Sequence, residues 1–173
     1  MNRGAQYAQG HWLWFVHADT RLTADTAQAF VRYLQYTRPD WGYCGLHLDD
    51  RRWIFRVIAW LMQQRTRLSR IATGDQGIFV QRRLFEQLGG YAAMPLMEDI
   101  ALSRRLKQYS HSACAPIRLT TSARRWQQQG ILRTILLMWW LRFAYFIGIS
   151  PHRLAAWYRS CPSPAPVLRI VDC

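Results

Sequence analysis

Residues 12–22, "WLWFVHADTRL", indicate the class of fold. The five apolar residues Trp12 to Val16 predict a short buried strand. His17 and Asp19 follow directly after it. Ligands of α/β proteins bind beyond the carboxyl ends of the strands, so the stretch is typical of an active-site strand. The alternative is that Asp19 only forms the turn that follows, as Asp often does.

The chain is strongly basic. Its 173 residues carry 23 Lys+Arg against 10 Asp+Glu, a formal net charge of +13. Half of the residues are hydrophobic and nine are Trp, which excludes a disordered composition and favours one folded domain. The charge favours an anionic partner: nucleic acid, a nucleotide, a phospholipid surface or a diphosphate-linked substrate. The cysteines form no CxxC pair and no signal peptide opens the chain, which predicts a cytoplasmic location.

Strand and helix patterns alternate along the chain. Apolar or alternating runs predict strands over 12–16, 41–48, 78–80 and 113–121. Helices are predicted over 2–9, from the N-cap Thr23 to 37, and over 51–68, 82–88, 98–109 and 131–149, with a short one after Ser150. The alternation predicts an α/β fold with a mostly parallel sheet and flanking helices. Three prolines within "CPSPAPVLRIVDC" predict an unstructured tail over 160–173.

Two of the predicted helices are unusually apolar. Helix 51–68 is amphipathic, with Trp53, Val57, Trp60 and Leu61 forming its apolar stripe. Helix 131–149 is hydrophobic, and its two arginines, nine residues apart, fall on opposite faces at about 100° per residue. Three placements of this helix stay open: across a membrane, on a membrane surface, or packed on the sheet or a partner. The paired Trp139-Trp140 with flanking Arg suits a membrane surface.

Asp99 is the candidate general base. It lies in "PLMEDIALSRRLK" (95–107), at a helix start, where the helix dipole favours a carboxylate. It shares a helix face with Leu102 and Leu106, so its side chain is expected to point inward. An inward carboxylate at a helix N-terminus suits proton abstraction. The alternative is helix capping by Glu98 or Asp99.

Two further segments carry candidate binding residues. In "ATGDQG" (72–77), the polar residues between two glycines suit hydroxyl binding on a rigid loop, or simply a turn. "SARRWQQQ" (122–129) combines cationic and aromatic groups into an anion-binding and stacking unit, although so basic a chain can contain adjacent arginines by chance. The residues concerned are Gly74, Asp75, Gln76, Arg124, Arg125 and Trp126.

The order and the residues of these motifs resemble those of the GT-A glycosyltransferases of family 2. Within that family the chain is most similar to the group associated with radical-SAM and selenoprotein-type domains. The resembling segments are "FVHADTRL", "GDQGIFVQRRLFEQLGGY", "PLMEDIALSRRLK", "SARRW" and "ISPHRLAAWY". The resemblance implies a Rossmann-like, nucleotide-diphospho-sugar transferase fold. It assigns 1–125 to the C-terminal two-thirds of the catalytic domain and 126–159 to C-terminal helices.

The resemblance also implies roles for single residues. His17-Ala18-Asp19 takes the place of the Asp-x-Asp motif, so Asp19, with His17, would hold the Mg²⁺ or Mn²⁺ of a nucleotide-diphosphate sugar. Asp99, preceded by Glu98, takes the place of the catalytic base of inverting enzymes. Gly74-Asp75-Gln76 would line the acceptor side. Arg125-Trp126, after Arg124, resembles the end of a Gln-x-x-Arg-Trp motif whose Gln position is Ser122 here.

The implied function is metal-dependent, inverting transfer of a sugar to a hydroxyl acceptor, which could be lipid-linked. The alternatives are a non-catalytic remnant or complementing half that binds a partner, and a basic binder of anionic surfaces or nucleic acid. No recognised nucleic-acid motif is present, so no nucleic-acid partner is expected. The strands that bind the nucleotide in the family have no counterpart here. We therefore expect strand 12–16 to be an exposed apolar edge and the chain to be unstable and weak in nucleotide-sugar binding.

Overall fold

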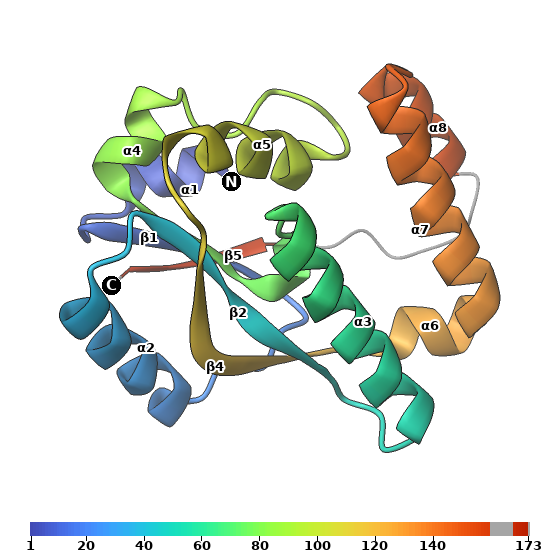
Figure 1. Ribbon diagram of the computed structural model, residues 1–173, viewed down its shortest axis with the longest axis horizontal. Coiled ribbons are helices and arrows are strands. Elements are labelled where there is room, and N and C mark those ends of the chain that lie inside the picture. The colour runs from blue at the N-terminus through green and yellow to red at the C-terminus, as the bar shows by residue number, and fades with distance from the viewer. Residues whose placement is uncertain (160–167, 173) are drawn as a thin grey trace.

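The computed structural model describes residues 1–159 and 168–172, and it is a mixed α/β structure built on one sheet (Figure 1). The strand order is β4-β2-β3-β1-β5. The strands are β1 (Trp12–His17), β2 (Trp41–Leu48), β3 (Ile78–Gln81), β4 (Ala113–Thr121) and β5 (Leu168–Asp172). The α/β class predicted from the sequence is confirmed.

Helices cover both faces of the sheet, because successive side chains of β1 point to opposite sides. Leu13 and Phe15 pack in a cluster with residues of α1, α4 and α5, while Trp14 and Val16 pack with residues of α2. The bounds of the helices on the first face are α1 (Asn2–Tyr7), α4 (Arg82–Gln87) and α5 (Glu98–Tyr109), and those of α2 are Ala24–Thr37.

The remaining helices extend the fold to one side. α3 (Trp53–Ser69) packs on β2 through a cluster that contains Leu48, Phe55 and Ile58. Beyond it lie α6 (Arg124–Gln129), α7 (Ile131–Phe146) and α8 (Pro151–Arg159) (Figure 1). The sequence pattern predicted all of these except α6. Among the described residues, no helix is both long and apolar enough to cross a bilayer.

The prediction of a mostly parallel sheet is wrong. Only β2 and β4 run parallel, whereas β3 is antiparallel to both β1 and β2, and β1 is antiparallel to β5. Apolar periodicity specifies that a strand is buried but does not specify its direction.

The expected exposed edge at β1 is also absent. β3 pairs with Trp12–Phe15 on one side, and β5 pairs with Leu13–His17 on the other. The prediction of an unstructured tail is therefore wrong for 168–172, while 160–167 and 173 lie outside the described residues. A strand with neighbours on both sides offers no free backbone edge for aggregation.

The α3 helix buries a different face from the predicted one. Phe55, Ile58 and Ala59 are buried against the sheet side. The expected apolar stripe is instead exposed, with Trp53 at 70% and Trp60 at 59%. Both faces of α3 are apolar, so periodicity alone could not decide which one the sheet would cover.

We predict that a chain ending at Arg159, which lacks β5, is less stable and aggregates. β1 would lose one of its two neighbours, and each lost backbone hydrogen bond contributes about 1 kcal/mol. The free energy of unfolding, from chemical denaturation, should fall by a few kcal/mol. A chain ending at Asp172 keeps β5 and should match the full chain. Equal stability of the two truncated chains would contradict the role given to β5.

Candidate functional site

The loop before β3 is fixed from two sides. Residues Gly74–Gln76 form a short 3-10 turn, η1. The Gln76 side-chain oxygen accepts hydrogen bonds from the Thr66 hydroxyl of α3 at 2.8 Å and from the Thr73 backbone N–H at 3.2 Å. On the other side, Trp14 Nε1 of β1 donates to the Gly77 carbonyl at 3.2 Å. Gln76 is wholly buried, so its observed contacts hold the loop in place.

Asp99 points toward this loop. Its Oδ2 accepts a hydrogen bond from the Gly74 backbone N–H at 2.9 Å, and its Oδ1 accepts one from the Ile100 N–H at 2.7 Å. The inward orientation predicted from the helix pattern is thus confirmed. Gly74 is needed there because a Cβ at that position would overlap the His17 ring. The loop therefore brings β1 and the start of α5 together around one carboxylate.

Two arginines accompany the carboxylates. Arg65 of α3 donates to the Thr73 hydroxyl at 3.2 Å, and that hydroxyl donates to Asp75 at 2.5 Å. Arg142 of α7 interacts electrostatically with both Asp75 and Asp99. We call Arg65, Asp75, Asp99 and Arg142 the carboxylate–arginine cluster. Its formal charges cancel, which is the arrangement that lets several ionised groups share a partly buried space.

Burial dominates the acid–base behaviour of the cluster. It raises the pKa of Asp99 above its ordinary value, while the N–H groups of Gly74 and Ile100 and the Arg142 guanidinium act in the opposite direction. Burial also raises the pKa of the neighbouring Glu98, and the Asp99 charge raises it further. Burial and the Arg142 charge lower the pKa of Arg65 to about 10. A carboxylate whose pKa moves toward neutrality is a better proton acceptor at working pH.

The two arginines of the cluster were not among the candidates chosen from sequence. Arg142 interrupts an apolar run, and its position opposite Arg133 already implied that one of the two points inward. The structure leaves Arg133 exposed and partly buries Arg142. Arg65 lies in a polar stretch of α3, where no sequence signal distinguishes it from its neighbours.

The proposed metal ligands have different partners. His17 lies against Gly74, whereas Asp19 is exposed and accepts a 3.4 Å hydrogen bond from the Thr121 hydroxyl. In the part of the chain that the structure describes, no three His, Cys, Asp or Glu side chains gather into a metal-binding group. The residues present therefore do not fit a preformed Mg²⁺ or Mn²⁺ site, and of the two proposed ligands only Asp19 is a carboxylate.

The arginine–tryptophan segment of α6 is directed elsewhere. Arg124 is exposed, and Arg125 contacts Tyr158 of α8 by a hydrogen bond and by stacking at 4.4 Å from the ring centre. Trp126 packs against the cluster of α3 that contains Phe55. Arg125 and Trp126 thus join α6 to α8 and α3, and the observed contacts of the three residues do not include Asp99.

Fold and site together define a mixed α/β protein with a partly buried, arginine-flanked carboxylate. Comparisons with protein-family models, with curated proteins and with solved structures find no match to this chain. The chemistry of the cluster is therefore the basis for a functional proposal.

We predict that Arg142→Gln raises the pKa of Asp99 further. The substitution removes a positive charge that favours the ionised carboxylate, so Asp99 should keep its proton to higher pH. Carboxyl ¹³C NMR titration of the labelled protein measures this directly. The exposed Arg133, on the opposite face of the same helix, provides the control, since Arg133→Gln should leave the Asp99 titration unchanged. An equal effect of both substitutions would place Arg142 outside the cluster.

We also predict that the protein alone binds Mn²⁺ weakly. Hard divalent cations in such sites take one or two protein carboxylates and complete their coordination with substrate phosphates. Calorimetric titration with Mn²⁺ should give no saturation at micromolar metal. Tight binding that Asp19→Asn abolishes would instead show that the strand end forms a metal site without substrate.

Proposed function

We propose that this chain is a glycosyltransferase of the GT-A, family 2 type, which moves a sugar from a nucleotide diphosphate to a hydroxyl acceptor with inversion. The observation that carries the proposal is the position of Asp99. Its carboxylate is partly buried, its pKa is raised, and it is hydrogen-bonded to the loop before β3 and interacts electrostatically with Arg65 and Arg142. The motif order that resembles the family predicts a base at this same residue.

The reaction needs only a few groups. Asp99 accepts the proton of the acceptor hydroxyl while the oxygen attacks the anomeric carbon. The bond between that carbon and the diphosphate oxygen breaks, and the diphosphate leaves with the bonding electrons. Arg65 and Arg142 supply positive charge beside the base, which stabilises developing negative charge in a site of low dielectric constant. Asp75 and Glu98 line the same region and are proposed to orient the acceptor.

A divalent metal enters the proposal only as an ion carried by the diphosphate, with Asp19 as its contact. None of the steps above depends on it. The proposed setting is the cytoplasm, where nucleotide sugars are the expected donors.

The test is Asp99→Asn. Loss of a general base lowers turnover by about 10²- to 10⁴-fold, while binding of the nucleotide sugar should persist because the base does not hold the donor. Release of nucleoside diphosphate from a panel of nucleotide sugars, with hydroxyl acceptors, measures turnover, and calorimetry measures binding. Glu86→Gln, which alters an exposed carboxylate on α4, is the matched control and should keep full turnover.

Two results would contradict the proposal. Turnover retained in Asp99→Asn would show that Asp99 is not the base. An inactive wild-type chain, across the whole donor panel, would favour the rival function of a non-catalytic half that binds a partner.

A further inference from the structure

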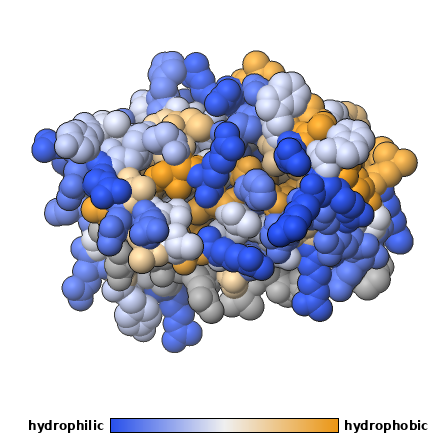
Figure 2. All heavy atoms as spheres, turned by 90° about the horizontal axis from the view of Figure 1, so that it is seen from below, coloured by the Kyte–Doolittle hydropathy of each residue, from blue (hydrophilic) through white to orange (hydrophobic). Residues whose placement is uncertain are grey.

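α3 and α7 expose a single apolar face. Five apolar side chains of α3 are exposed: Trp53, Val57, Trp60, Leu61 and Leu68. Six more are exposed on α7: Leu132, Leu136, Trp139, Trp140, Phe143 and Phe146. Monomeric proteins seldom leave so many large apolar residues of neighbouring helices in water. Figure 2 shows hydrophobic residues gathered toward the right of the molecule, the side on which Figure 1 places α7.

The two sets adjoin one another. Ile58 of α3 and Ile135 of α7 belong to one hydrophobic cluster, so the helices pack along these positions. At about 100° per residue, Leu61 lies about 60° around α3 from Ile58, and Trp139 lies about 40° around α7 from Ile135. Leu61 and Trp139 therefore lie beside the contact between the helices, and the other exposed apolar residues of α3 extend away from it around the helix. We call this combined surface of α3 and α7 the apolar face.

Arginines border the apolar face, and Asp50, which lies just before α3, is hydrogen-bonded to Arg52 and Gln127. On α3, the exposed Arg56 and Arg67 lie within about 40° of Trp60 around the helix, on the side away from α7. On α7, the exposed Arg133 lies in the same row as Trp140. Residues 51–74 and 100–159, which contain both helices, include no Asp or Glu at all. The two helices of the apolar face therefore carry arginines and no acidic residue.

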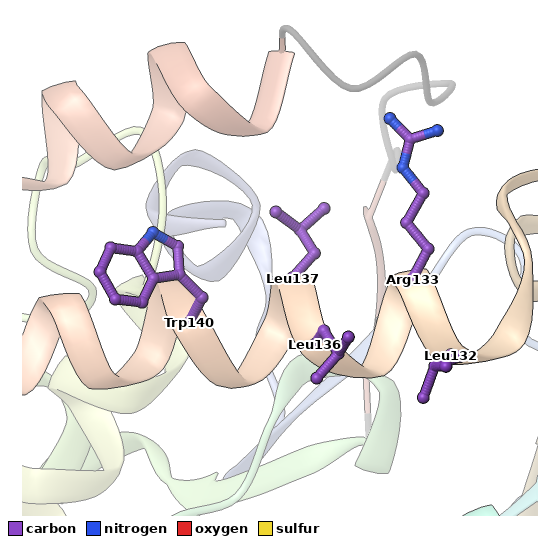
Figure 3. Close-up of a pocket in the computed structure, with 5 residues that line it drawn as sticks. All are labelled: Leu132, Arg133, Leu136, Leu137 and Trp140. Atoms are coloured by element: carbon purple, nitrogen blue, oxygen red, sulfur yellow. The ribbon is translucent and has the colours of Figure 1, made fainter.

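A groove on the outside of α7 also combines apolar side chains with an arginine. It has a volume of about 490 Å³ and is lined by four apolar residues and one arginine. Figure 3 shows Arg133 and Leu137 projecting to one side of the helix, and Leu132 and Leu136 to the other. An open apolar surface next to a guanidinium suits contact with a hydrocarbon chain that carries a phosphate group.

We propose that the apolar face docks on the surface of an anionic phospholipid bilayer. Tryptophan rings concentrate at the membrane–water boundary, and arginines extend their charged ends to lipid phosphates while their stems stay in apolar surroundings. The helices lie in the plane of the interface and do not cross it. Each arginine near an anionic surface strengthens attachment by about fivefold. A second copy of the chain fits less well, because two such faces would bring arginines against arginines.

Vesicle flotation tests the proposal without reference to any enzymatic activity. The full chain should float with vesicles of phosphatidylglycerol and phosphatidylcholine in equal parts, and much less with phosphatidylcholine alone. Raising the salt concentration should release it, because the charge attraction is screened. The double variant Trp60→Ser/Trp139→Ser should bind at least about tenfold more weakly. Tyr36→Ser, at an 88% exposed aromatic on α2, should bind as the wild type does.

A second pair of variants tests the charged border. Arg56→Gln/Arg133→Gln should weaken binding to the anionic vesicles, whereas Arg32→Gln on α2 should have a smaller effect. Thermal unfolding followed by circular dichroism checks that every variant is folded. Absence of flotation, or equal flotation of the tryptophan variant and the wild type, would overturn the proposal. It would also be overturned by a dimer in light scattering that the tryptophan variant loses, without vesicle binding.

Discussion

The hydrogen bond from the Gly74 N–H to the Asp99 carboxylate joins the parts of the molecule on which the site depends. The donor belongs to a loop that Gln76 fixes to α3 and that Trp14 fixes to β1. The acceptor lies in the first turn of α5, so this interaction joins the start of that helix to the loop, while Leu102 and Leu106 pack the helix on the sheet. A residue larger than glycine would collide with His17. The packing of His17 at the strand end, the shape of the loop at Gly74 and the position of Asp99 therefore depend on one another.

The partly buried carboxylate also requires compensating positive charge, because ionised groups are costly to remove from water. Arg65 and Arg142 supply this charge from two different helices, and Asp75 balances the second positive charge. Since Arg142 comes from α7, the peripheral helices are part of the electrostatics of the site. The tertiary packing of α7 is consequently linked to the protonation of Asp99, although the two are far apart in sequence.

Much of the fold could be predicted from local patterns. The bounds of β2 and β4 agree with the alternation of their residues, and α2 begins after Thr23, whose hydroxyl accepts the Thr26 N–H. Strand direction was not predictable, because burial is the same for parallel and antiparallel neighbours. The pairing of β1 with β5 was not predicted, because the prolines that precede β5 in the sequence favoured an unstructured tail. For the site, Asp99 could be found by its helix face. The sequence implied that one of Arg133 and Arg142 points inward but not which one, and nothing distinguished Arg65 from its neighbours.

The two faces of α7 have different surroundings. Its inward face carries Arg142, whose charge is compensated by carboxylates, and packs through Leu141 and Ala144. Its outward face has large apolar side chains and no acidic residue. A helix that only completed the core would need no outward tryptophans, and a spanning helix could not keep Arg142 within the electrostatic influence of Asp75 and Asp99. A helix that lies between the polar site and the apolar face accounts for both sets of side chains. Docking of the apolar face on a bilayer would then hold the site close to the membrane surface.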